Sequence, residues 1–166
     1  SRSPKVKLYL NDKLIGEKET GKENYTATFD VPYEPGTLKA VNSKGKEEFV
    51  LKTAGEPAAI RLIADRSKIK ACKNDLSYVK IELVDKNGNV VPETSLPVKI
   101  ECTGKGTVIA GGNAAYADME SFRSLTPNTF RGKAIAIVQP DGEKGDIQVK
   151  VSTKGLEDAS IVITTY

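Results

Sequence analysis

The sequence contains no histidine and no tryptophan, and it has only one methionine and two cysteines. Without histidine, neither a Ser-His-Asp nor a Cys-His catalytic arrangement can be built, and the commonest metal ligand is missing. Two cysteines without histidine do not make a zinc site. We therefore expect no catalytic residue, no metal site and no cofactor in this chain.

Long apolar runs and one-sided charge are also missing. No apolar stretch approaches the roughly 18 residues that a membrane-spanning helix needs. The 25 basic and 22 acidic residues are interspersed, so the net charge of +3 forms no basic stripe for nucleic acid. We expect a soluble, globular protein that has no membrane or nucleic-acid partner and carries no targeting segment in this chain.

The two cysteines, Cys72 and Cys102, are expected to stay unpaired. In LPVKIEC, alternation places Cys102 on the face of Val98 and Ile100, whereas Cys72 lies opposite Ile69 in its own strand. This parity favours a buried thiol at Cys102 and a free Cys72. Pairing in an oxidising compartment is the alternative.

Apolar residues recur with period two in the first third of the chain, as expected for strands with one buried face. KVKLYLN places Val6, Leu8 and Leu10 together, and EFVLK places Phe49 and Leu51 together. YTATFDV does the same with four residues: Tyr25, Ala27, Phe29 and Val31. The predicted strands are 5–10, 13–19, 25–31, 37–42 and 47–52.

The same period continues after TAGEP, where short strands alternate with turn signals. Such spacing is typical of two packed sheets or of a closed sheet. The predicted buried residues of the first two strands are Ile60, Leu62, Ala64, Val79, Ile81 and Leu83. We predict an all-β protein with two immunoglobulin-like β-sandwich domains in tandem, at 1–54 and 55–166. The first is small for a complete sandwich, so it is expected to be truncated or to lean on the second.

Glycine-containing turns explain the motifs that resemble ligand-binding loops. Asn87-Gly88 in DKNGN predicts a hairpin with a type I′ turn. A calcium-binding hand would need its glycine at the sixth position of the loop, but Gly88 is at the fourth. GKGTVIAGGN is not closed by the lysine-serine or lysine-threonine pair of a phosphate loop, and no helix is expected after it. Its glycines are expected to let strands turn and approach closely: Gly104, Gly106, Gly111 and Gly112.

The stretch AAYADMESFRSL is the strongest candidate for a contact site. Its large side chains recur every three residues, which fits either one or two helical turns or an irregular loop anchored by Phe122. The candidate residues for an interdomain or partner contact are Tyr116, Met119, Glu120, Phe122 and Arg123. The alternative is that this segment only plugs the end of its own sandwich.

Two hypotheses that involve a sugar ligand, a catalytic carboxylate pair and a carbohydrate-binding face, have weaker support. Asp118 and Glu120 lie two residues apart in this loop, whereas a glycosidase pair must converge across a sugar at about 5–9 Å. We take them as solvated loop charges. A carbohydrate-binding face could use Tyr33, Tyr78 or Tyr116, but no tryptophan platform supports it.

Nearly the whole chain resembles the region after the catalytic barrel in glycoside hydrolase family 2 enzymes, above all β-galactosidases of the Bacteroides type. The strings that carry the resemblance are KVKLYLNDKLIGEK, ATFDVPYEPGTLKAV, VLKTAGEPAAIRLIADR, LSYVKIELVDKNGNVVP and SFRSLTPNTFRGKAIAIVQP. The resemblance implies non-catalytic accessory domains that support the catalytic barrel or subunit contacts in carbohydrate degradation. The family's two catalytic glutamates lie on that barrel, so none maps onto this chain.

The resemblance also implies partners and a compartment. The expected partners are the catalytic domain of the parent enzyme and further copies of it, in the periplasm or outside the cell. One departure from the family pattern is the segment GGNAAYADME, where GNGNP is often found. A second hypothesis is a bacterial adhesin or invasin repeat, which IRLIADRSKIKACKNDLSYVKIELVDKNGNVVP also resembles. A free-standing carbohydrate-binding module is the third.

Overall fold

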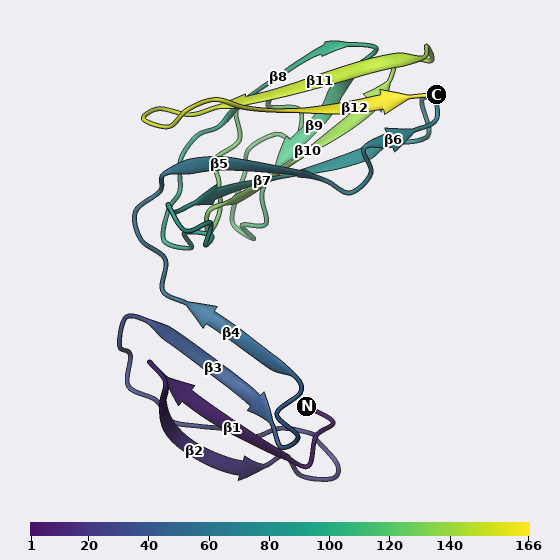
Figure 1. Cartoon of the computed structure of the whole chain (residues 1–166). Coiled ribbons are helices and arrows are strands. Elements are labelled where there is room, and N and C mark those ends of the chain that lie inside the picture. The colour runs from purple at the N-terminus through teal and green to yellow at the C-terminus, as the bar shows by residue number, and fades with distance from the viewer. The chain divides into compact units, whose positions relative to one another are not determined.

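The computed structural model describes all 166 residues and contains strands but no helix (Figure 1). The chain divides into unit 1, Ser1–Thr53, and unit 2, Ala54–Tyr166. No helix of the kind that crosses a membrane is present. The all-β fold predicted from the sequence is confirmed.

Unit 1 contains a single antiparallel sheet with the strand order β2-β1-β3-β4. The strands are β1 (Lys5–Leu10), β2 (Lys13–Glu19), β3 (Thr37–Asn42) and β4 (Glu48–Lys52). Leu8 and Leu10 of the central strand β1 are its buried apolar residues. Four of the five strands predicted for this part of the chain are present.

The fifth predicted strand, 25–31, is wrong. The segment 20–36 contains no strand, and Tyr25 has a positive φ of 52°, which breaks the extended conformation. The segment is instead held against β2: Lys18 donates to the carbonyl of Thr28 at 2.7 Å, and the Phe29 ring lies 3.6 Å from where a Cβ on Gly16 would be. Phe29 therefore covers part of the sheet from a loop.

The edge strand β4 also differs from the expectation of one buried face. All five of its residues are exposed, and Phe49 and Leu51 are 68% and 55% exposed. Pairing through Ala40↔Phe49 and Leu38↔Leu51 places both on the face of Leu8 and Leu10. The segment 20–36 packs over β2, at the opposite edge of the sheet, so it leaves β4 uncovered.

Unit 2 is a sandwich of two four-stranded sheets. The first has the order β5-β7-β10-β9, and the second has the order β6-β12-β11-β8 (Figure 1). The strands are β5 (Ala59–Ala64), β6 (Lys68–Ile69), β7 (Ser77–Val84), β8 (Lys99–Gly104), β9 (Gly106–Gly112), β10 (Lys133–Pro140), β11 (Gly145–Ser152) and β12 (Ala159–Thr165). All pairings within these two sheets are antiparallel except β12 with β6.

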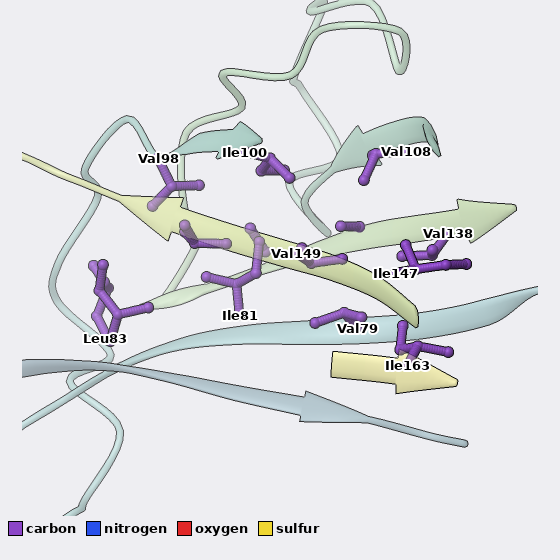
Figure 2. Packing of buried hydrophobic residues seen from close by; sticks show 14 of the residues in the cluster. Val79, Ile81, Leu83, Val98, Ile100, Val108, Val138, Ile147, Val149 and Ile163 are labelled. Carbon is purple, nitrogen blue, oxygen red and sulfur yellow. The ribbon is translucent and has the colours of Figure 1, made fainter. Parts of the chain in front are cut away.

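Aliphatic side chains from both sheets fill the space between them (Figure 2). Val79, Ile81 and Leu83 of β7 are fully buried against Val149 and Ile163 of the opposite sheet. In the first half of β7 they alternate with exposed residues, as the predicted period of two requires, whereas the alternate residues of the second half, Glu82 and Val84, are buried as well. No buried polar side-chain atom lacks a hydrogen-bond partner.

Both cysteines are free. Cys72 is exposed, and Cys102 is half-buried with its Sγ 3.6 Å from the carbonyl oxygen of Gly106. Burial raises the pKa of the Cys102 thiol. These positions agree with the parity argument made from the sequence.

The DKNGN hairpin is present, but its turn type is not the predicted one. Gly88 has a φ of 79°, and Asn87 does not have a positive φ. The amide of Gly88 donates to the carbonyl oxygen of Asp85 at 2.9 Å. The amide of Asp85 donates to the carbonyl oxygen of Asn89, also at 2.9 Å. Lys86 and Asn87 therefore form the centre of a type I turn, and Gly88 follows it in the left-handed region.

The Asp85 carboxylate fixes this hairpin and the start of unit 2. Asp85 is 3% exposed and accepts from the amides of Gly55, Asn87 and Asn89 at 2.9 Å and from the Asn89 side chain at 3.0 Å. The hydrogen bond from the Gly55 amide contributes most to lowering the pKa of Asp85 well below its ordinary value of 3.8, and the bond from the Asn89 side chain contributes next. Four donors directed at one carboxylate stabilise its ionised form.

Asp85→Asn is expected to lower the melting temperature of unit 2 at pH 7 by roughly 5–10 °C, because the amide supplies one acceptor where two were used. A depressed pKa means that the carboxylate stabilises the fold above pH 4 and loses that contribution as the pH falls through the folded-state pKa. The difference between wild type and variant should therefore narrow below pH 4. Thermal melts at pH 7 and pH 3, with the exposed Glu157→Gln as control, measure this; a constant difference would contradict it.

Candidate functional site

The candidate site is the loop of residues 113–128, which connects the end of β9 to the segment before β10. It contains no helix, so the loop alternative is the correct one. Its backbone is tied to the sandwich: Gly111 donates to Phe122 at 2.7 Å, Ile100 to Leu125 at 2.8 Å, and the amide of residue 98 to the carbonyl of residue 127 at 3.0 Å. The loop is therefore held firmly at its second half.

Asn113 organises the first half of the loop. Its Oδ1 accepts from the amide of Ala115 at 2.7 Å, and its Nδ2 donates to Asp118 at 2.5 Å and to the carbonyl of Asn128 at 2.9 Å. Asp118 in turn accepts from the amide of Glu120 at 2.9 Å. The bonds to the amides of Ala115 and Glu120 are local side-chain turns of the kind that Asn and Asp form readily, whereas the bond to Asn128 joins the two ends of the loop.

Glu120 is held by a second asparagine. Its Oε1 accepts from Asn128 Nδ2 at 2.8 Å. Asp118 and Glu120 thus both accept hydrogen bonds from asparagine side chains of the loop, and these bonds give the two carboxylates a role in the shape of the loop. Sequence reasoning missed Asn113 and Asn128; the only available signal was the Asn after Gly111-Gly112, where the chain departs from the family pattern.

Large apolar side chains of the loop face solvent, and three of them are mostly exposed; the fourth, Leu125, is 40% exposed. Tyr116 is 99% exposed, Met119 is 95% exposed and Phe122 is 70% exposed. Arg123 is also exposed, and its amide is held by Ser121 Oγ at 3.2 Å. Side chains this exposed do not plug the end of the sandwich, so that alternative fails for Tyr116 and Met119.

Phe122 is the anchor of the loop on the sheet. A Cβ on Gly112 would lie 2.8 Å from the Phe122 ring, which no real side chain tolerates. Gly112 is buried for the same reason: the ring lies over it. The predicted role of this glycine, close approach between chain segments, is correct.

A shallow hollow of about 30 Å³ lies beneath the loop, between Gly111, Asn113, Asp118, Phe122 and Pro127. That volume holds about one water molecule, so it does not admit a sugar ring. No group of three or more His, Cys, Asp or Glu side chains converges anywhere in the chain. The arrangement suits a protein contact better than it suits a ligand.

The tyrosines considered for a sugar platform do not form one set. Tyr33, 81% exposed, belongs to unit 1, whereas Tyr78 and Tyr116 belong to unit 2. Tyr78 projects from β7 and Tyr116 from the loop.

The fold and this loop define an all-β module that presents large exposed apolar side chains. The family model for glycoside hydrolase family 2 C-terminal domain 5 matches residues 60–162, and a model described as a domain of unknown function matches residues 1–49. The chain therefore belongs to glycoside hydrolase family 2 as a C-terminal domain of its members.

Individual relatives agree. A β-galactosidase of Bacteroides ovatus is 32% identical over 99% of this chain and 20% of its own length. A β-glucuronidase of Formosa agariphila is 28% identical over 98% of this chain and 17% of its own length. The crystal structure of a family 2 member from Bacteroides cellulosilyticus superposes with a TM-score of 0.91 at 37% identity, covering 99% of this chain and 23% of that one. The chain spans about a fifth of the length of these relatives.

The D00-D0 domain of intimin is similar to this chain in fold only. The match covers 78% of this chain and 62% of that one, with a TM-score of 0.50 and 17% identity.

Proposed function

We propose that this chain is a non-catalytic accessory region of a family 2 β-galactosidase, where it supports the catalytic domain or the contacts between subunits. The observation that carries the proposal is the 113–128 loop: its carboxylates are bound to asparagines, while Tyr116 and Met119 are presented to solvent. Large exposed apolar side chains on an otherwise well-ordered loop are typical of a protein contact.

The choice of β-galactosidase over β-glucuronidase rests on sequence similarity. The relative at 32% identity is a β-galactosidase, and the β-glucuronidase relative is at 28%. The catalytic glutamates of the family are expected on the barrel, outside these 166 residues. The partner of the loop is then the catalytic domain of the same polypeptide or a second subunit.

The isolated chain is expected to show no hydrolysis of a chromogenic β-galactoside. Asp118 and Glu120 are already bound to asparagines of the loop, and the hollow of about 30 Å³ that both line is too small for a sugar ring. The measurement is release of the chromophore by purified chain, compared with Asp118→Asn and Glu120→Gln. Turnover that purifies with the chain and disappears in either variant would overturn the non-catalytic assignment.

The supporting role has its own test in the full-length enzyme. Deleting these 166 residues should shorten the half-life of its activity at elevated temperature, since the contact surface of the remaining protein would be left uncovered. A deletion that leaves both activity and half-life unchanged argues against any supporting role. Affinity electrophoresis in galactan gels tests the carbohydrate-binding alternative: retarded migration of the chain would favour it.

A further inference from the structure

In strand β10, small side chains point into the core and larger apolar side chains point outward, which is unusual for a sandwich strand whose outer face contacts solvent. Ala134 and Ala136 point into the core and are 6% and 0% exposed. The larger Ile135 and Ile137 alternate with them, so they lie on the outer face of the sheet and are only half-buried. An outer face normally carries polar residues, so these two isoleucines need another explanation.

Cross-strand pairing extends this outer apolar surface from Ile135 and Ile137 onto the neighbouring strands. Ile137 pairs with Tyr78 of β7 and with Ala110 of β9. Ile135 pairs with Lys80, and Lys80 pairs with Ile63 of β5. Directly opposed residues have Cβ atoms about 5 Å apart, so these side chains form one surface, which we call the outer face of β10.

The 113–128 loop continues this surface. Ile135 pairs with Gly112, and the Phe122 ring lies over Gly112. Phe122 therefore connects the outer face of β10 with the exposed Tyr116 and Met119. Among the pairs named above, Lys80 is the charged side chain. The next row of the same face is charged throughout: Lys133 of β10 pairs with Glu82, and Glu82 pairs with Arg61, whose guanidinium lies 2.6 Å from it.

The outer face of the other sheet is built differently. Lys99 pairs with Glu101 at 2.8 Å, and Lys150 of β11 pairs with Asp158 at 2.7 Å. Its outward residues are mostly polar, and Val162 is its exposed apolar exception, 48% exposed. The two sheets share one core, so the difference between their outer faces does not come from folding of the sandwich.

We propose that the outer face of β10, together with Tyr116, Met119 and Phe122, is one docking surface for the catalytic part of the same polypeptide. This inference rests on the proposed function and adds the location of the contact. The relatives are about five times as long as this chain, so most of the protein lies outside it and can cover such a face. The partner surface should be apolar with a carboxylate opposite Lys80.

A second copy of the chain fits less well. A two-fold symmetric contact places the same patch on both subunits. Lys80 lies between Ile63 and Ile135 in the row of paired residues, so two copies would bring like charges together inside an apolar contact.

The test compares Ile137→Lys with Val162→Lys, two outward residues on opposite sheets. In the isolated chain both should shift the melting temperature slightly and equally, because a lysine can extend to solvent from either position. In the full-length enzyme Ile137→Lys should shorten the half-life of activity severalfold, and Val162→Lys should leave it unchanged. Tyr78→Lys replaces Ile137→Lys if the latter does not fold.

The outcomes separate this inference from the proposed function. If deletion of the chain shortens the half-life but Ile137→Lys and Val162→Lys behave alike, the supporting role stands and this docking surface is wrong. If the isolated chain dimerises in sedimentation equilibrium and Ile137→Lys abolishes the dimer, the occupant is a second copy and the assignment to the catalytic part is overturned. Hydroxyl-radical oxidation of Tyr78 and Met119 should also fall severalfold from isolated chain to full-length enzyme.

Discussion

Ile81→Ala is expected to lower the free energy of unfolding of unit 2 by about 4 kcal/mol. Ile81 is fully buried between the two sheets, on the central strand β7, and its loss leaves a cavity that the packed aliphatic residues around it can only partly fill (Figure 2). Urea unfolding followed by far-ultraviolet circular dichroism measures this change, since the chain has no tryptophan for fluorescence.

Ile137→Ala is the matched control. It removes the same atoms from the neighbouring strand, but from the outer face, where the side chain is only half-buried. In the isolated chain it should cost about 1 kcal/mol or less. Equal losses for the two variants would show that β10 does not present Ile137 outward, and the docking surface would fail with it.

Gly104→Ala should destabilise unit 2 by about 3 kcal/mol or more, because strain and a backbone clash act together. Gly104 has a φ of 96°, and a Cβ there would lie 2.1 Å from the carbonyl oxygen of Asp146. That oxygen accepts from the amide of Lys105 at 2.9 Å, so moving it away would also disturb the pairing of β8 with β11.

Gly142→Ala isolates the strain alone. Gly142 has a similar φ of 109°, but nothing lies within 4 Å of its added Cβ. It should cost about 1–2 kcal/mol, the usual penalty for a left-handed residue with a side chain. Chemical denaturation of both variants gives the comparison, and a Gly104→Ala variant no less stable than Gly142→Ala would rule out the clash.

The strands could be predicted where alternation coincided with burial. In β7, Val79, Ile81 and Leu83 are both the alternating residues and the core residues. The prediction failed at 25–31, where the same alternation is present but the segment pairs with no strand. Period two indicates which residues share a face, but it does not supply a neighbouring strand with which to pair.

The candidate loop was found for a simpler reason. Tyr116, Met119 and Phe122 stood out because large apolar side chains occur in a stretch without strand periodicity. Their exposure depends on hydrogen bonds from Asn113 and Asn128, which lie 15 residues apart. No pattern in the sequence connects those two asparagines, so the shape of the loop could not be predicted.

The sequence by itself determined the all-β class, the aliphatic core, the absence of a histidine-based site and the resemblance to family 2, because all four are properties of residue type and local spacing. The tertiary structure alone decided which face of β10 turns inward. In β10 the alternation of alanine with isoleucine allows either orientation. The opposite sheet already fills the core with large residues such as Ile147 and Val149, so the alanines turn inward and the isoleucines remain outside.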